Sequence, residues 1–403
     1  MGKDEKGAWA QFWGTFFGKT WPMWAGGILL ALLNIGLFLV KSPWGGSGSY
    51  ISWGENLYSR LNLFDLSAVT PVLSNKYGLL GFLTLLGAFV GALMGRDFAL
   101  RVPPPGEVFK GVLGGVLMGL GATLGIGCTI GGFMSGWAAL SGGAIILAVG
   151  FLIGTYVALR YLLWEMEHAP KMSQGKSYTW LAAKGRGGVW QPVLGVAVAV
   201  FLLAYFGSRF QSDNVLAMFA VIGLLMGVIL QRSRFCIVRA FREPFMTGES
   251  EAPLGVMAAL AVGIFGFTVI KYMGVGTSTP GAARELAMTW VYSHFWLRAL
   301  IGGVIFGLGM TVAGGCAIGA IWRSGEGQVK LWFAMLGFLL MAPISKKFIV
   351  PGFANALPEW AQRKVFMPDY FGYWGAALVF FILIVLWYVF VKWNERTGRF
   401  SAV

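Results

Sequence analysis

Charged residues are scarce in this sequence. Asp, Glu, Lys and Arg make up 12% of the 403 residues, against roughly 25% in soluble domains. Among the charged residues, the 17 Asp and Glu are fewer than the 31 Lys and Arg. Hydrophobic residues, by contrast, make up 57% of the sequence. This composition excludes an ordinary soluble domain and predicts an all-α polytopic membrane protein.

Paired metal and disulfide ligands are also missing. The three cysteines, Cys128, Cys236 and Cys316, are an odd number and include no C-x-x-C pair. The two histidines, His168 and His294, neighbour no cysteine in sequence. A disulfide framework and a structural zinc site both need paired ligands. We therefore predict no metal site and no cofactor.

Long apolar stretches are what the sequence has instead. Most approach the ~17–25 residues of a membrane helix, and the first is too long, after a polar start, for a cleavable signal peptide. The ten predicted spans are 22–40, 79–95, 111–127, 143–163, 189–206, 215–230, 254–273, 299–315, 331–345 and 371–391.

The net charge of +14 follows mostly from membrane topology. With a cytoplasmic N-terminus, 20 of the 31 Lys and Arg fall in cytoplasmic segments, so the positive-inside rule favours both termini in the cytoplasm. No nucleic-acid partner is expected; the bilayer is the partner. No acidic residue within a span marks a proton relay, which favours channel-like movement of a solute.

Two segments of the chain repeat each other. Residues 110–132 (KGVLGGVLMGLGATLGIGCTIGG) and 298–320 (RALIGGVIFGLGMTVAGGCAIGA) are identical at eleven of 23 positions, and each carries one cysteine, Cys128 or Cys316. Duplicated, glycine-interrupted apolar segments indicate the substrate site of a transporter. Five crossings separate the copies, and an odd number predicts an inverted repeat.

The repeat divides the chain into two halves. We predict a first half at 1–164, which includes an added N-terminal span, a cytoplasmic linker at 165–188, and a second half at 189–403. Segments 45–63 and 231–248 are too polar to span and too apolar for loops, so both are predicted re-entrant hairpins. The repeat offset of 188 pairs Cys236 with Gly48.

Glycines surround the two repeated cysteines. Gly127, Gly314 and Gly315 directly precede them, and we expect the helical backbone to unwind there. Gly131 and Gly319 follow at matched positions and are expected to support the same turns. The other repeated glycines suit close helix packing.

The cysteines suit contact with a soft anion. A buried thiol stays neutral because burial disfavours the thiolate, and it can donate a weak S–H bond to sulfur. The alternatives are that the cysteines only pack, or that Cys236 is the persulfide-forming nucleophile of a membrane thiol enzyme. Arg234 and Arg323 are candidates for attracting an anion, although Arg323 could instead pair locally with Glu326.

At these residues the chain resembles the YeeE/YedE family of sulfur-compound membrane transporters. The resemblance rests on QRSRFCIVRAFRE at 231–243, GGVIFGLGMTVAGGCAIGAIWRSGEGQ at 302–328 and GGVLMGLGATLGIGCTIGG at 114–132. It implies a bacterial inner-membrane importer of thiosulfate, with S–H···S contacts from Cys128, Cys236 and Cys316. It also implies handover to a cytoplasmic TusA-like sulfur carrier.

The order of the halves differs from that of the thiosulfate-type members. In those proteins the half with the R-F-C and A-G-G-C-A-x-G motifs comes first, whereas here it comes second. This order is closer to the YedE branch, which the resemblance associates with selenium or general sulfur metabolism. A selenium compound is therefore the alternative substrate.

Overall fold

The fold is described from a computed structural model. It describes residues 13–64, 69–125, 127–169, 175–182, 190–208, 213–275, 280–292 and 295–401, so the predicted contexts of His294 and of parts of the linker lie outside the described residues. The elements are α2 (Met23–Val40), α3 (Gly46–Arg60), α4 (Lys76–Met94), β1 (Leu100–Val102), α5 (Pro105–Leu124), the π-helix η1 (Thr129–Met134), α6 (Ser135–Ala138), α7 (Gly142–His168), β2 (Tyr178–Trp180), α8 (Trp190–Ser208), α9 (Asn214–Ser233), α10 (Ile237–Met246), α11 (Glu251–Met273), α12 (Pro280–Met288), α13 (Leu297–Ala313), α14 (Ala317–Gly325), α15 (Val329–Ile344), the π-helix η4 (Ser345–Ile349), α16 (Val350–Asn355), the 3-10 helix η5 (Glu359–Gln362) and α17 (Pro368–Thr397).

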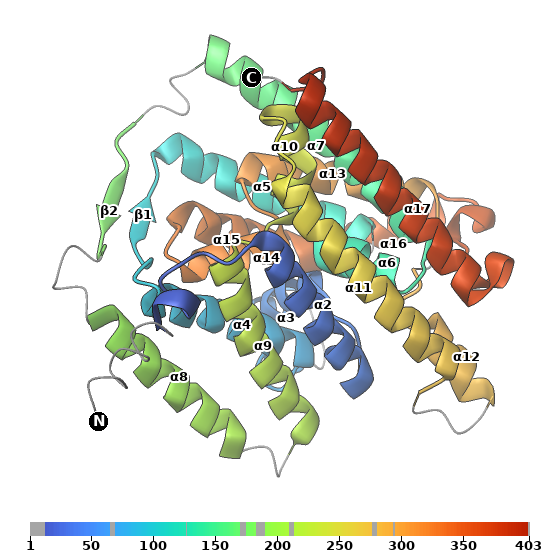
Figure 1. The fold of residues 1–403 in the computed structure, drawn as a ribbon, viewed down its shortest axis with the longest axis horizontal. Helices are drawn as coiled ribbons and strands as arrows, with labels where there is room; N and C mark the ends of the chain where they lie inside the picture. The colour runs from blue at the N-terminus through green and yellow to red at the C-terminus, as the bar shows by residue number, and fades with distance from the viewer. Residues whose placement is uncertain are drawn as a thin grey trace.

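Ten helical segments of the described chain are long and apolar enough to cross a membrane, one for each predicted span. The all-α polytopic class is therefore confirmed. The described strands are β1 and β2, which pair antiparallel beside the bundle. Figure 1 shows α8 at one edge of the molecule and α17 at another. Both expose many large apolar side chains, as lipid-facing helices do.

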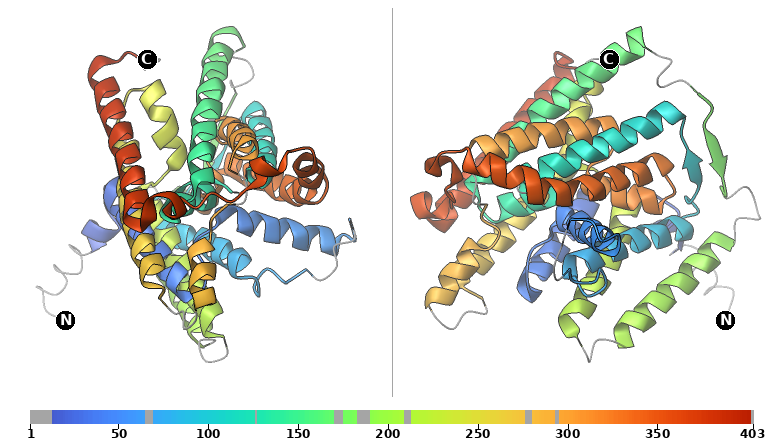
Figure 2. Two further views of the ribbon diagram at one scale, coloured as in Figure 1. Left: turned by 90° about the vertical axis from the view of Figure 1, so that its right-hand side faces the viewer. Right: turned by 180° about the vertical axis from the view of Figure 1, so that it is seen from behind.

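The remaining helices pack in pairs that repeat between the halves. α4 packs along α9 as α11 packs along α2, and α5 packs along α15 as α13 packs along α7. Viewed from behind, α13, α5 and α15 lie side by side (Figure 2). Each pair joins one helix from each predicted half, so neither half encloses its core alone.

The repeated glycines form the centre of this arrangement, where α5 crosses α13. A Cβ at Gly114 would lie 2.6 Å from the carbonyl oxygen of Gly309, and one at Gly121 would lie 2.7 Å from that of Gly302. Small residues permit such close backbone approach. The contacts run in opposite order along the two helices, so these equivalent helices are antiparallel, as an inverted repeat requires.

Three of the ten segments are interrupted, and each interruption carries a cysteine. α5 ends at Leu124 before Cys128, α13 ends at Ala313 before Cys316, and α9 ends at Ser233 before Cys236. The break after α13 needs a glycine, because Gly314 has a φ of +79°, a conformation that costs other residues more.

The two predicted re-entrant segments each contain one short helix, α3 or α10. Cys236 is the residue before α10, and the residue in the same position before α3 is Gly45. The predicted pairing of Cys236 with Gly48 was therefore wrong by three residues. The cause is where the preceding helices end. By the offset of 188 the end of α9 at Ser233 corresponds to residue 45, but α2 already ends at Val40, and the turn after it (41–45) is only two residues longer than the turn after α9 (234–236).

Candidate functional site

Each of the three cysteines is the N-cap residue of a short helix. Cys128 precedes η1, which continues into α6, Cys236 precedes α10, and Cys316 precedes α14. The Sγ atom of Cys316 accepts a hydrogen bond from the Gly319 backbone N–H at 3.4 Å. The first N–H groups of a helix have no partner within the helix and carry a partial positive charge. Each thiol therefore lies beside the unpaired backbone N–H groups at the start of a helix.

The three thiols belong to one buried cluster. A Cβ at Gly319 would lie 3.5 Å from Sγ of Cys316 and 3.9 Å from Sγ of Cys236, so both sulfurs lie near this glycine. A Cβ at Gly46, the first residue of α3, would lie 3.2 Å from Sγ of Cys128. All three cysteines are 0% exposed and belong to the main hydrophobic core.

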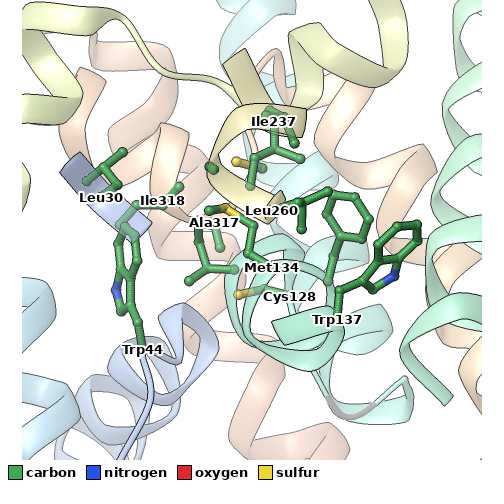
Figure 3. Close-up of a cluster of buried hydrophobic side chains, with 14 of the residues drawn as sticks. Leu30, Trp44, Cys128, Met134, Trp137, Ile237, Leu260, Ala317 and Ile318 are labelled. Carbon is green, nitrogen blue, oxygen red and sulfur yellow. The ribbon is translucent and has the colours of Figure 1, made fainter. Parts of the chain in front are cut away.

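The surroundings of the cluster are apolar on two sides. Figure 3 shows Cys128 close to Met134 and Ala317, with Trp44 on one side and Trp137 on the other. Since no thiol is exposed, the sulfurs have no contact with solvent in this structure.

Two polar side chains that the sequence did not single out lie next to the cysteine cluster. Tyr50 of α3 is buried near both Cys128 and Cys316, and its hydroxyl donates to the carbonyl oxygen of Ala317 at 2.6 Å. The buried Thr129 hydroxyl lies near Cys316 without a partner of hydrogen-bond geometry. An aromatic residue within the polar segment 45–63 was the available signal for Tyr50.

One cavity opens beside the Cys128 turn, and we call it the Arg298 cavity. Its volume is about 510 Å³, and it extends from α3 to the start of α13. Its lining includes Gly45, Ser47, Gly48, Tyr77, Thr123, Gly127, Gly131, Trp290, Tyr292, Arg298 and Lys346.

Hydrogen bonds fix the wall of the Arg298 cavity. Arg298 donates to the carbonyl oxygen of Leu124 at 2.8 Å and is 6% exposed. Trp290 donates to the Gly131 carbonyl oxygen at 2.8 Å, and the Tyr292 hydroxyl donates to the same oxygen. Burial raises the pKa of Tyr292 well above its usual value, so this hydroxyl stays protonated and remains a donor.

A second cavity adjoins the turn before Cys316, and we call it the Arg242 cavity. Its volume is about 300 Å³. It is related to the first by the repeat, because Thr311 and Lys110 occupy the positions equivalent to Thr123 and Arg298. The polar part of its lining is Glu107, Lys110, Glu165, Arg242, Thr311, Gly314 and Lys330. Each of the two equivalent cavities thus adjoins one of the repeated cysteine-bearing turns.

The two arginines predicted to attract anions have separate roles in the structure. Arg323 donates to the Gly314 carbonyl oxygen at 3.0 Å, beside the Arg242 cavity. Arg234 pairs with Glu326 at 3.4 Å and lies outside the lining of both cavities. The local pair of Arg323 with Glu326 was wrong, because Glu326 is the C-cap of α14 and its carboxylate meets Arg234 instead.

Among the described residues, no group of three His, Cys, Asp or Glu side chains could hold a metal ion. Residues that the sequence did not single out are Tyr50, Tyr292, Arg298 and Arg242. Arg298 begins the second repeat copy, and this was the available signal for it. Arg242 is one of four arginines in a basic run, so the sequence alone did not distinguish it.

The chain is similar in sequence to several curated transporters. The chain is 26% identical to the probable transporter YedE of Escherichia coli K12 over 98% of both chains. It is 26% identical to the probable transporter YedE of Salmonella typhimurium LT2 over 97% of both. It is also 28% identical to the thiosulfate transporter TsuA of E. coli K12, over 43% of this chain and 46% of TsuA.

The family model described as sulphur transport matches residues 2–157 and 232–402, which is most of the chain. These two matched regions contain both repeat copies and all three cysteines. They also contain the helix interruptions and most of the lining of both cavities. The chain is therefore an integral membrane protein that belongs to the sulphur transport family.

Proposed function

We propose that this protein carries a small sulfur-containing anion through a path that passes Cys128, Cys316 and Cys236. Thiosulfate is the substrate that we favour. The observation that supports this path best is the cysteine cluster, in which each thiol caps a helix and two of the cysteine-bearing turns each adjoin one of two equivalent cavities. The names of the TsuA relatives support thiosulfate as the substrate. The YedE-like order of the halves makes a selenium compound the alternative.

The chemistry of the cluster suits weak and reversible contact with an anion. A neutral thiol can donate S–H to the terminal sulfur of thiosulfate, and the helix N-termini stabilise its negative charge without a fixed cation. Several weak sites in series let an ion enter and also leave. A buried ammonium or guanidinium between the thiols would hold a divalent anion more tightly.

Transport requires the closed cluster to open. Gly46 and Gly319 lie beside the sulfurs, and neither carries a side chain. We infer that an anion passes along the faces that these glycines leave open, once the helices that carry the thiols separate. The path leads from the Arg298 cavity to the Arg242 cavity.

The orientation of the path belongs to the same proposal. Both termini lie in the cytoplasm of a bacterial cell, in the inner membrane, so the Arg298 cavity faces outward and the Arg242 cavity faces inward. The halves 1–164 and 189–403 share the path, and the linker 165–188 is cytoplasmic. A TusA-like sulfur carrier then receives the imported sulfur at the inner side.

Uptake of sulfur-labelled thiosulfate by cells that lack their own thiosulfate transport tests the proposal. Cells that express this chain should accumulate the label, with stronger competition from unlabelled thiosulfate than from sulfite or selenite. Stronger competition by selenite would identify a selenium compound, rather than thiosulfate, as the substrate. Absence of uptake together with a stoichiometric persulfide on Cys236, seen by intact-mass measurement, would favour the thiol enzyme and contradict the transporter.

A further inference from the structure

Arg242 lies at the inner end of the proposed path with no partner for its buried nitrogen. It is six residues after Cys236, on α10, and its side chain lines the Arg242 cavity. Its Nε atom is buried and has no hydrogen-bond partner among the described residues. A buried polar group of this kind costs free energy unless something in the cavity compensates it.

The other charges that line the cavity already neutralise one another. Lys110 contacts Glu107 at 2.9 Å and Glu165 at 2.5 Å, and Lys330 contacts Glu107 at 2.6 Å. Two carboxylates therefore balance two ammonium groups. Arg242 is the one cation that remains among the described lining residues, and the cavity carries a net positive charge.

A second guanidinium reinforces this excess. Arg323 lies close enough to Arg242 to repel it, whereas Glu243, which is already paired with Arg239, lies close enough to attract it. Arg323 also donates to the carbonyl oxygen of Gly314, which lines the cavity. Two guanidinium groups thus lie beside a cavity that adjoins the turn before Cys316. Their repulsion is relieved if an anion lies between them.

A topological role alone does not explain Arg242. Positive-inside residues extend toward lipid headgroups and water. Arg160 on α7 is such a residue, since it is exposed and its guanidinium donates to the Tyr156 hydroxyl at 2.9 Å. On α10 itself, Arg239 pairs with Glu243, one turn further along the helix. Arg242 differs from both, because it lines the cavity and makes no ion pair of its own among the described residues, although Glu243 attracts it from further away.

We propose that the Arg242 cavity is a binding site for a small divalent oxyanion, with Arg242 as the residue that holds the charge of the anion. A guanidinium presents planar N–H donors that match oxyanion oxygens. The site rests on the proposed function, in which it holds the sulfur anion after the cysteines and before release. An acceptor of the imported anion on the inner side would take the anion from this site.

Equilibrium binding of labelled thiosulfate, and of sulfate as an anion without a terminal sulfur, to the purified full-length protein tests this site directly. Arg242→Gln keeps the size of the side chain and removes its charge, whereas Arg160→Gln removes the same charge outside the cavity. Because Arg242→Gln removes a charge-assisted contact, it should weaken the affinity of the anion bound in the Arg242 cavity about tenfold or more. Arg160→Gln should leave the isotherm unchanged, and Arg242→Lys should restore part of the affinity.

An Arg242→Gln isotherm that overlays the wild-type isotherm, with unchanged thermal stability, would overturn the site. The same holds if Arg242→Gln and Arg160→Gln weaken binding equally. Transport then separates the site from the proposed function. In inside-out vesicles, Arg242→Gln should raise the thiosulfate concentration for half-maximal uptake about tenfold, with no such rise in right-side-out vesicles. Vesicles in which the wild type moves no thiosulfate would contradict the proposed function, while the binding result would still decide the site.

Discussion

At the scale of single residues, the site depends on what stands beside each sulfur. Cys236 and Cys316 share Gly319 as a neighbour, and Cys128 touches Gly46. Glycine at these positions leaves space beside thiols that are otherwise enclosed by the core. The sequence pointed to the cysteines because they recur beside glycines in the two copies.

A methyl group at Gly319 should obstruct the path without disturbing the fold. In Gly319→Ala the new Cβ would make ordinary contacts with the two sulfurs, at 3.5 and 3.9 Å. We expect thiosulfate uptake to fall about tenfold or more, which corresponds to roughly 1.4 kcal/mol in the barrier, with an unchanged melting temperature. Gly263→Ala is the matched control, because its Cβ would meet Ala138 Cβ at 3.5 Å, in α6 rather than at a thiol. Equal uptake by both variants would show that the ion passes elsewhere.

Other residues could not be chosen from the sequence. Arg239 and Arg242 are three positions apart in one basic run. Only the fold shows that Arg239 meets Glu243 while Arg242 lines a cavity. Likewise Tyr292 lies far from Cys128 in sequence, and its contact with Gly131 depends on how α13 packs against α5.

At the scale of helices, the glycines of α5 and α13 set how closely the two repeats approach. Hydropathy was sufficient to predict the ten spans, because each must satisfy its backbone within a helix. It could not predict that α3, α10 and α14 begin at the cysteine cluster, since cysteine and glycine in sequence do not identify a helix N-cap. It also could not give the register of Gly45, which depends on α2 ending earlier than its equivalent α9.

A side chain at this crossing should destabilise the protein. A Cβ at Gly302 would lie 2.2 Å from the backbone nitrogen of Gly125, so Gly302→Ala must push the helices apart at a cost of roughly 1–3 kcal/mol. Gly36→Ala in α2 meets nothing within 4 Å and should change stability by less than about 1 kcal/mol. Thermal unfolding in detergent compares the two. A melting temperature for Gly302→Ala equal to that for Gly36→Ala would contradict the close crossing.

At the scale of the whole molecule, the pairing of helices between the halves accounts for the inverted repeat. The odd number of crossings between the two cysteine copies predicted this inversion, and the antiparallel contact of α5 with α13 bears it out. What counting could not show is that α4 with α9 and α2 with α11 also pair across the halves. The two cavities follow from this pairing, since each is lined from both halves.

Single added cysteines should react from opposite sides of the membrane. Leu61 directly follows α3 and Thr247 directly follows α10, so each lies at the end of one of the two re-entrant segments, and both are exposed. The native thiols are 0% exposed and should give little background. With a membrane-impermeant maleimide on intact cells, Leu61→Cys should label and Thr247→Cys should label only after lysis. Labelling of both in intact cells would contradict the proposed topology.

The most direct measurement is thiosulfate uptake by liposomes that contain only the purified protein. The wild type should take up labelled thiosulfate with saturation, above empty liposomes. A variant with Cys128, Cys236 and Cys316 all changed to Ala should take up none beyond background, although it folds. Val256→Ala, a buried truncation in α11 of the same core, should lower stability and keep uptake. Saturable uptake by the triple variant at the wild-type rate would contradict the cysteine path, and absence of uptake by the wild type would contradict thiosulfate transport itself.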